Sequence, residues 1–488
     1  MQTRGNTLRK IIDGLEAGDW SARELVTAYA ARAKDGQKGT HAFVDVHEES
    51  ALAAAEESDR RRAGGESRSR FDGVPIAVKD NLMVAGHRAT AGSAILKDYV
   101  APYDATVVDR LKRAGGIVIG KTNMDEFAMG SSTETSFFGP SRNPWDTERV
   151  PGGSSGGSVV AVAEGSAPAA LGSDTGGSVR QPAALCGVVG LKPTYGRVSR
   201  YGLMATASSL DQIGPITRTV EDAALLLREI EGRDSNDSTS LEIKNEWRLP
   251  DSLPTSVRGL RIGLPKEYFV SGMEPGVEAA VRAAADRLAE LGAELKEVEL
   301  PHSKYALAVY YVLMPCEVSA NLARFDGIRY GRREPAETLE GTYRRSRGSG
   351  FGREVRRRIM IGTYALSSGY YDAYYLRAMK VRRLIANDFA RAFSDVDCIL
   401  TPTTPTVAWK LGEMSDDPLS MYLQDIYTVS VNVAGLPAIT FPCGLSEGLP
   451  VGVQLIGRQF DEKTILGAAH AYETADGGFG RYLPPEVA

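Results

Sequence analysis

The chain is poor in the residues that most often build metal sites and cross-links. Its 488 residues include only 4 cysteines and 5 histidines. The cysteines are scattered without CxxC spacing, which argues against a zinc site and against a disulfide framework. Scattered cysteines of this kind are typical of a reducing compartment, so we expect a cytoplasmic protein without a bound metal. They are Cys186, Cys316, Cys398 and Cys443.

Long apolar segments are also missing. No uninterrupted apolar run reaches about eighteen residues, so we expect no membrane-spanning helix. The polar start of the sequence, residues 1–6, lacks the apolar region of a signal peptide. The formal net charge of −5 argues against a surface that coats nucleic acid. An apolar content of 43% and a charged content of 24% are ordinary for a globular protein with a large core.

Nothing in the sequence divides the chain into modules. A chain of this length holds about three domains on average, but we find no proline- and serine-rich linker, low-complexity tract or repeat. We therefore expect one large domain. From Phe71 onward, strand and helix patterns alternate, which predicts an α/β layered fold with a mixed sheet.

Hydrophobic periodicity and capping signals predict the individual elements. We expect N-terminal helices over 7–17, from a capping box at Ser21 and Glu24 to about 33, and over 50–63. Later helical patterns cover 106–114, 274–291, 305–324, 353–393 and 461–473. Strands are expected over 74–78, 117–119, 260–264, 294–300, 398–400, 438–441 and 451–456, and a polar surface excursion over 234–255.

Two loops rich in glycine and serine begin twenty residues apart. The first reads Gly-Gly-Ser-Ser-Gly-Gly-Ser over 152–158, and the second reads Gly-Ser-Asp-Thr-Gly-Gly-Ser over 172–178. Glycine clusters let a backbone approach a ligand closely, and successive N–H groups can form a nest for negative charge. The small, apolar segment between the loops, 159–171, suits a buried connector. The pattern predicts an oxyanion site beside a serine nucleophile.

A serine nucleophile needs a base, and neither loop contains a histidine. The apolar run Val74–Val78 predicts a buried strand that ends in Lys79. Burial disfavours the ammonium form and lowers the pKa of a lysine from about 10.4 toward neutrality. A neutral Lys79 is therefore our candidate for the base.

Lys79 and the two loops together resemble the signature of the amidase signature family, whose members use a Ser–cis-Ser–Lys triad. The resemblance implies that Ser178 is the nucleophile that forms the acyl ester, and that Ser154 relays its proton to Lys79. It also implies a cis peptide before Ser154, for which Gly153 leaves room. The backbone N–H groups that would form the oxyanion hole belong to Thr175, Gly176, Gly177 and Ser178.

The same resemblance implies the architecture. We expect a single domain over 1–488 with a central mixed, twisted β-sheet that is covered by helices on both faces. A helical layer would occupy about 1–65, and the core with the catalytic loops about 70–220. The remaining sheet and helices, about 260–488, would form the substrate pocket.

Four longer motifs, at 123–130, 190–197, 208–215 and 324–331, resemble one branch of the family, the A subunits of bacterial glutamyl-tRNA(Gln) amidotransferases. This branch implies a glutaminase in a heterotrimer with B and C subunits, a carbon–nitrogen ligase that uses glutamine as amido donor. The ammonia would amidate Glu-tRNA(Gln), or Asp-tRNA(Asn) in some organisms. The resemblance implies no cofactor in this chain, because ATP, Mg²⁺ and most of the tRNA contact belong to the B subunit.

The resemblance also assigns substrate contacts. Arg358 would clamp the glutamine carboxylate and Asp425 would hold the ammonium, with Tyr310 as a third contact. From the sequence alone, a solvated basic helix face is the better explanation of Arg358, because its neighbours are also arginines. The stretch 329–358 contains ten arginines and four acidic residues. This composition suits a solvated face or a partner contact as well as a nucleic-acid patch.

Other interpretations remain open. The first loop also fits the G-x-S-x-G nucleophile elbow, but the proline-containing stretch 143–151 before it is a poor central strand, and only His470 could serve as its late histidine. No Gly-Lys-Ser/Thr follows the glycines, which argues against a phosphate-binding loop. Lys121 is interpreted as a surface lysine rather than a second active-site lysine. The alternative functions are a free-standing amidase with another carboxamide substrate, or an inactive subunit that only scaffolds a complex.

Overall fold

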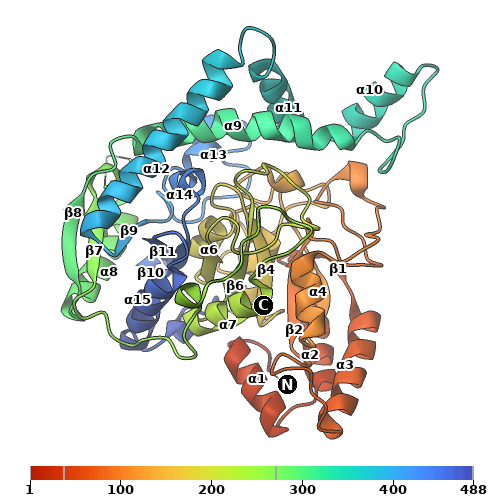
Figure 1. Cartoon of the computed structure of the whole chain (residues 1–488). Coiled ribbons are helices and arrows are strands. Elements are labelled where there is room, and N and C mark those ends of the chain that lie inside the picture. Colours follow the sequence, from red (N-terminus) through yellow and green to blue (C-terminus); the bar gives the residue numbers. More distant parts are fainter. Residues whose placement is uncertain (1, 37–38, 270–271, 486–488) are drawn as a thin grey trace.

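The structure is a computed structural model that describes residues 2–36, 39–269 and 272–485. Its centre is one sheet of 11 strands in the order β1-β3-β2-β4-β6-β5-β10-β11-β9-β7-β8 (Figure 1). β2 runs parallel to β3 and β4, and β7 runs parallel to β8 and β9, whereas the other pairs are antiparallel. The sheet is therefore mixed, as expected. One continuous sheet joins strands from Phe43 to Gly457.

The strands are short, and most are buried along their whole length. Their bounds are β1 Phe43–Val46, β2 Pro75–Lys79, β3 Ile117–Thr122, β4 Ala169–Asp174, β5 Val189–Lys192, β6 Gln212–Thr217, β7 Arg261–Pro265, β8 Glu294–Val298, β9 Cys398–Pro402, β10 Ala438–Ser446 and β11 Leu449–Gly457.

The helices are more numerous in the second half of the chain. Their bounds are α1 Leu8–Ala17, α2 Ala22–Gly36, α3 Glu48–Ala63, α4 Thr106–Arg113, α5 Gly156–Glu164, α6 Arg180–Cys186, α7 Val220–Ile230, α8 Pro275–Glu290, α9 Ala306–Asn321, α10 Leu339–Gly350, α11 Arg353–Ala365, α12 Arg377–Asp395, α13 Pro418–Leu423, α14 Val429–Ala434 and α15 Glu462–Ala475.

Helices cover both faces of the sheet. On β10, successive side chains point to opposite faces. Thr440 lies beside Gly452 and Ala184 of α6, whereas the ring of Phe441 lies 5.3 Å from that of Tyr472 on α15. Since α6 and α15 contact neighbouring residues of one strand, they cover opposite faces, and the sheet is sandwiched between helical layers.

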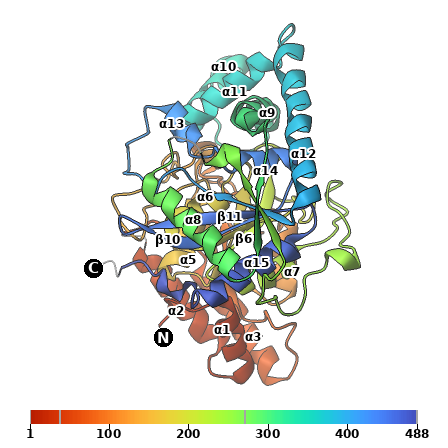
Figure 2. The same ribbon diagram turned by 90° about the vertical axis from the view of Figure 1, so that its left-hand side faces the viewer.

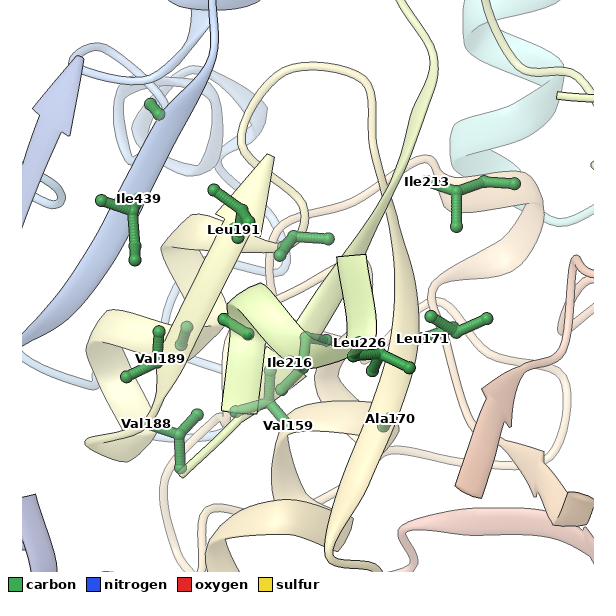
Figure 3. Packing of buried hydrophobic residues seen from close by; sticks show 14 of the residues in the cluster. Val159, Ala170, Leu171, Val188, Val189, Leu191, Ile213, Ile216, Leu226 and Ile439 are labelled. Atoms are coloured by element: carbon green, nitrogen blue, oxygen red, sulfur yellow. The ribbon is translucent and has the colours of Figure 1, made fainter. Parts of the chain in front are cut away.

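The hydrophobic core lies between these layers and is continuous through the molecule. Figure 3 shows its centre, where side chains of α5 and α7 meet the faces of β4, β5, β6 and β10. The first glycine- and serine-rich loop leads into α5 and the second follows β4, and both elements are anchored in this core. The labelled residues are Val159, Ala170, Leu171, Val188, Val189, Leu191, Ile213, Ile216, Leu226 and Ile439.

A helical cap lies over one end of the sheet. α9 packs against α11, α12 and α14, and Figure 2 looks along α9 with α11 and α12 on either side of it. The stretch Ser303–Arg324, which contains α9, is long and apolar enough to cross a membrane by length and composition alone. Half of its most apolar window is buried inside the molecule, as in the core helices of globular proteins.

Most of the expected elements are present, with shifted ends. The capping box at Ser21 is formed, since Glu24 N–H donates to Ser21 Oγ at 3.1 Å and Ser21 N–H donates to Glu24 at 2.9 Å. The connector 159–171 is buried, and it contains most of α5 and the start of β4. The helical pattern over 353–393 is two helices, α11 and α12, joined by an exposed turn and the π-helix η7, Asp372–Leu376.

The interpretation of Lys121 from the sequence is wrong. Lys121 is not a surface lysine, because β3 continues through Gly120 to Thr122 and carries Lys121 into the interior. Its side chain is fully buried and forms an ion pair with the buried Asp80, with Nζ and Oδ1 3.1 Å apart. The hydrophobic pattern of this short strand predicted an end at 119 and did not show that β3 extends to Thr122.

Candidate active site

The ends of two neighbouring strands bring the lysine and the two loops together. β2 ends at Lys79, and the adjacent β4 ends at Asp174, from which the second loop continues. The first loop lies against both, and Lys79 Nζ is 2.8 Å from Ser154 Oγ. The structure therefore places the predicted base and the predicted bridging serine in hydrogen-bond contact.

Lys79 is surrounded by hydroxyl groups. Its Nζ lies 2.8 Å from Ser155 Oγ, and 3.0 Å and 3.2 Å from the hydroxyl and carbonyl oxygens of Ser173. Burial lowers the pKa of the Lys79 amine to about 7. The more distant carboxylates of Asp125, Asp174 and Asp211 oppose this shift without abolishing it. A large part of Lys79 is thus unprotonated near neutral pH and able to accept a proton.

The first loop takes a shape that only glycine permits. The peptide between Gly153 and Ser154 is cis. A Cβ atom at Gly153 would lie 2.1 Å from Oδ2 of Asp125, a buried carboxylate that also accepts the Thr133 N–H. The close approach of Asp125 thus explains why a glycine precedes Ser154.

An internal ion pair holds the second loop. Arg180 and Asp174 are both fully buried, and Arg180 Nε lies 3.0 Å from Asp174 Oδ2. Burial alone would raise the pKa of the Asp174 carboxyl, but the charge and hydrogen bonds of Arg180 hold it at about 2. Arg180 also donates to the Thr428 carbonyl and to Gln454 Oε1, so the loop is tied to the helical cap and to β11.

Ser178 lies at the end of this loop and is 8% exposed. Its carbonyl accepts the Ser155 N–H at 3.1 Å, which joins the two loops. Within residues 2–36, 39–269 and 272–485, its hydroxyl has no hydrogen-bond partner, and no hydrogen bond links it to Ser154. The Ser178 hydroxyl is therefore available to a substrate.

The backbone of the second loop offers free N–H groups. Gly177 N–H donates to Asp174 Oδ1 at 2.9 Å and is already satisfied. The N–H groups of Thr175, Gly176 and Ser178 have no acceptor in the described part of the chain. Three of the four N–H groups expected in the oxyanion hole are thus free, and Gly177 serves the shape of the loop in this structure.

Arg358 is a buried residue of α11, so the solvated basic face is the wrong interpretation for it. Its Nε donates to Glu354 Oε1 at 2.7 Å, and its Nη1 lies 3.7 Å from Met314 Sδ. The guanidinium carbon is 5.2 Å from the ring centroids of Tyr311 and Tyr422. A cavity of about 210 Å³ adjoins Arg358, with Glu354 and Tyr422 in its wall.

Other arginines of the 329–358 stretch do form a solvated face. On α10 the exposed Arg344 pairs with Glu340, and at the start of α11 Arg353 pairs with Asp416. These exposed pairs contribute little to stability. The basic composition of the segment therefore conceals one buried arginine among exposed and half-buried ones.

Asp425 and Tyr310 lie close to the second loop, since Thr428 Oγ1 donates to the carbonyls of Gly176 and Asp425 and Tyr310 covers Gly176. The Ser131 hydroxyl donates to Asp425 Oδ2 at 2.8 Å, and burial raises the pKa of Asp425 to about 7. Tyr310 covers Gly176 so closely that a Cβ there would lie 2.7 Å from its Cζ atom. The charges of Arg358 and Asp425 both act on Tyr310, which places the three predicted substrate contacts in one neighbourhood.

The nucleophile-elbow interpretation does not fit this arrangement. The stretch before Gly152 forms only isolated bridges, so no strand leads into the first loop. His470 lies on α15, and its Nδ1 is 3.1 Å from the Pro254 carbonyl oxygen. The group within reach of Ser154 is Lys79, not a histidine.

Several residues that complete the site were not singled out from the sequence. Ser155 and Ser173 contact Lys79 directly, and Asn81 donates to Ser173 Oγ at 2.9 Å. Ser155 and Ser173 stand inside the loop motifs, so their positions were the available signal. Nothing in the linear order links Asp174 to Asn432, or Arg180 to Gln454, because these contacts form only when distant parts of the chain assemble around the sheet. Among the described residues, no group of three or more metal-binding side chains occurs.

Comparisons with known proteins agree with this geometry. The family model described as Amidase matches residues 24–466. The chain is 58% identical over 469 residues to the A subunit of the glutamyl-tRNA(Gln) amidotransferase of Carboxydothermus hydrogenoformans, covering 95% of this chain and 96% of that protein. A protein of the same description from Roseiflexus sp. is 57% identical over 470 residues, covering 96% of each.

Solved structures give the same result. The crystal structure of the A subunit of glutamyl-tRNA(Gln) amidotransferase from Thermotoga maritima is 45% identical, covers 100% of this chain and 99% of its own, and has a TM-score of 0.82. A bacterial aryl acylamidase is 25% identical with a TM-score of 0.87, covering 100% and 99%. The chain therefore belongs to the amidase family, as its lysine and its two loops indicate.

Proposed function

We propose that this chain is the glutaminase, or A, subunit of a glutamyl-tRNA(Gln) amidotransferase, and that it hydrolyses glutamine through Ser178, Ser154 and Lys79. The observation that carries the mechanism is the 2.8 Å contact between buried Lys79 Nζ and Ser154 Oγ. The function itself is supported by relatives of that description, which match the chain over nearly its whole length.

The first step is a proton relay. Neutral Lys79 accepts the proton of the Ser154 hydroxyl, and Ser154 accepts the proton of Ser178 in turn. Ser178 Oγ then attacks the side-chain carboxamide carbon of glutamine. The Ser178 hydroxyl can turn toward Ser154 when substrate binds, because no hydrogen bond to another described residue holds it.

The tetrahedral intermediate places a negative charge on the former carbonyl oxygen. The free N–H groups of Thr175, Gly176 and Ser178 are the donors that would stabilise it. Collapse of the intermediate breaks the C–N bond, and the nitrogen leaves as ammonia with the proton returned through Ser154. Water then attacks the glutamyl ester of Ser178, which releases glutamate and restores the serine.

Glutamine is distinguished from simple amides by its charged amino-acid end. Arg358 would bind the α-carboxylate and Asp425 the α-ammonium, with Tyr310 as a wall beside Gly176. Burial raises the pKa of Asp425 to about 7 when only protein groups surround it. A bound ammonium would favour the carboxylate form, which couples recognition of the substrate to ionisation of Asp425.

Within the assembly, this chain supplies ammonia, and the B and C subunits do the rest. The B subunit would bind most of the tRNA and use ATP and Mg²⁺ to activate Glu-tRNA(Gln) or Asp-tRNA(Asn). The four buried, free cysteines suit a cytoplasmic location. The division of the single domain into a helical layer (1–65), a catalytic core (70–220) and a pocket-forming remainder (260–488) is part of this proposal.

The nucleophile can be identified directly. Ser178→Ala should abolish glutamine hydrolysis and leave the folded state intact, because this hydroxyl makes no internal hydrogen bond among the described residues. Wild-type enzyme quenched early after mixing with glutamine should carry a glutamyl group on the peptide that contains Ser178. An adduct on Ser154 instead would contradict the assignment.

The alternative functions predict different results. A free-standing amidase would hydrolyse simple carboxamides without partners and would show no preference for glutamine. An inactive scaffold would release no ammonia from glutamine in any assembly. Glutamine-dependent amidation of Glu-tRNA(Gln) by the reconstituted B and C subunits, lost in Ser178→Ala and restored by added ammonia, would support the proposed function against both.

A further inference from the structure

Arg358 is held along one edge only. Its Nε donates to Glu354 Oε1 at 2.7 Å, whereas the Nη1 group faces the thioether sulfur of Met314 at 3.7 Å. A thioether is a weak acceptor compared with a carboxylate. The strong contact therefore fixes the guanidinium, and the terminal edge that binds carboxylates in a forked geometry has no strong acceptor among these contacts.

Glu354 is itself fully engaged. Its Oε1 accepts from both Arg358 Nε and the Tyr422 hydroxyl, the latter at 2.6 Å, and its Oε2 accepts from Arg357. Burial would raise the pKa of Glu354, but the charge of Arg358 and the hydrogen bond from Tyr422 keep it below its usual value. Glu354 is thus a carboxylate with fixed orientation between two arginines.

Two tyrosine rings complete the support. Tyr311 and Tyr422 stack with their centroids 4.0 Å apart, and the Arg358 guanidinium carbon lies 5.2 Å from each centroid. Tyr422 therefore restrains Arg358 twice, through its ring and through its hydroxyl on Glu354. An arginine side chain has many rotamers, and holding it before the substrate arrives reduces the entropy lost on binding.

From this geometry we infer that Glu354, supported by Tyr422, is a positioning residue that sets the specificity for the amino-acid end of the substrate. It binds Arg358 through Nε and so leaves the two terminal nitrogens for the α-carboxylate of glutamine. This inference rests on the proposed role of Arg358. Glu354 does not touch the reacting atoms, so its loss should weaken glutamine binding far more than the chemical step.

The test compares two substrates in the assembled enzyme: glutamine, and butyramide, which lacks the amino-acid end. Glu354→Ala should raise KM for glutamine about tenfold or more, with a smaller change in kcat, and should leave kcat/KM for butyramide within about twofold. Glu354→Gln keeps an acceptor oxygen for Arg358 Nε and should recover part of the loss. Tyr422→Phe keeps the ring and should have a smaller effect of the same kind.

The chain contains a matched control. Glu340 and Arg344 form the same i,i+4 pair on the neighbouring α10, where both side chains are at least three-quarters exposed. Glu340→Ala should leave KM and kcat unchanged for both glutamine and butyramide. A thermal midpoint close to that of wild type would show that Glu354→Ala is folded, and the butyramide rate measures its catalytic site independently.

Three results would overturn the inference. If Glu354→Ala lowers kcat/KM equally for glutamine and butyramide, the role of Glu354 is structural. If Glu354→Ala keeps normal glutamine kinetics while Arg358→Lys loses them, Arg358 does not need Glu354. If Arg358→Lys itself affects the two substrates equally, the assignment of Arg358 fails, and the inference falls with it while the Ser178 mechanism stands.

Discussion

Lys79 and Lys121 occupy neighbouring strands of one sheet, and both side chains are fully buried. In the parallel pairing of β2 with β3, Lys121 lies beside Val78, one position before Lys79. Burial lowers the pKa of both lysines. They differ in their partners, because Lys121 has the carboxylate of Asp80 at 3.1 Å, whereas the near neighbours of Lys79 are hydroxyl and carbonyl oxygens.

In the proposed mechanism, this difference separates a structural lysine from a catalytic one. A carboxylate in contact stabilises the ammonium form and offsets part of the desolvation of Lys121. Hydroxyl groups can accept from an ammonium or donate to an amine, so they leave both protonation states of Lys79 accessible. Burial alone does not make a base; a buried lysine must also lack a paired carboxylate and lie within reach of the hydroxyl whose proton it accepts, as Lys79 does beside Ser154. The predictions below test this contrast, from the largest expected effect to the smallest.

Lys79→Arg should reduce glutamine hydrolysis about a thousandfold or more, because arginine stays protonated and cannot act as a base. Lys79→Ala should be comparably inactive. The matched change Lys121→Arg keeps the charge beside Asp80 and should cost less than about tenfold. Steady-state rates of ammonia release measure all three, and equal losses for Lys79→Arg and Lys121→Arg would refute the contrast.

Asp80→Asn should destabilise the protein by about 3–5 kcal/mol, because it leaves a buried ammonium without its counter-charge. The double variant Asp80→Asn with Lys121→Met removes both charges and should recover much of that loss. Denaturant titration of the three proteins measures the effect. Strictly additive losses would mean that the two side chains do not form a coupled pair.

Asn81→Asp would give Lys79 a carboxylate at nearly constant size. Asn81 donates to Ser173 Oγ at 2.9 Å, and that hydroxyl is 3.0 Å from Lys79 Nζ. A negative charge one hydroxyl away should raise the pKa of Lys79 by about one unit. The acidic limb of kcat/KM against pH should move upward by the same amount, and an unmoved limb would show that this limb does not report Lys79.

The last prediction concerns the dependence of stability on pH. The folded-state pKa of Lys79 is about 7, below its ordinary value of 10.5. Between these values the unfolded chain binds a proton that the folded protein lacks, so raising the pH stabilises the fold. The slope approaches about 1.4 kcal/mol per pH unit between pH 8 and 10. Lys79→Met should lack this contribution, which thermal midpoints of both proteins at pH 7 and 9 would show.

The sequence was enough to predict the contact between Lys79 and Ser154 but not the residues that surround it. Lys79, Ser154 and Ser178 stand in or beside motifs that resemble those of a known family. Strands β5 and β6 were not predicted, because Gly190, Gly214 and Pro215 interrupt their short apolar patterns. Both strands are buried and complete the sheet only through long-range pairing.

Arg358 shows how little of the substrate pocket could be predicted from the sequence. Its immediate neighbours are arginines, and helical periodicity did not settle which of them turns inward. The burial of Arg358 depends on Met314 of α9 and on Tyr422 of α13, which lie 44 and 64 positions away (358 − 314 and 422 − 358). The prediction for Lys121 was wrong for a similar reason. Its partner Asp80 directly follows the end of another strand, β2.

The protonation of Lys79 in the folded enzyme can be measured directly. Lysines labelled with carbon-13 at Cε can be titrated by NMR, with the Lys79 signal assigned by its loss in Lys79→Arg. The assignment matters because burial lowers the pKa of Lys192 to about 7 as well. We expect the Lys79 signal to titrate with a midpoint near 7. A midpoint near the ordinary lysine value of about 10.4 would show that Lys79 is an ammonium at working pH and would contradict the proposed mechanism.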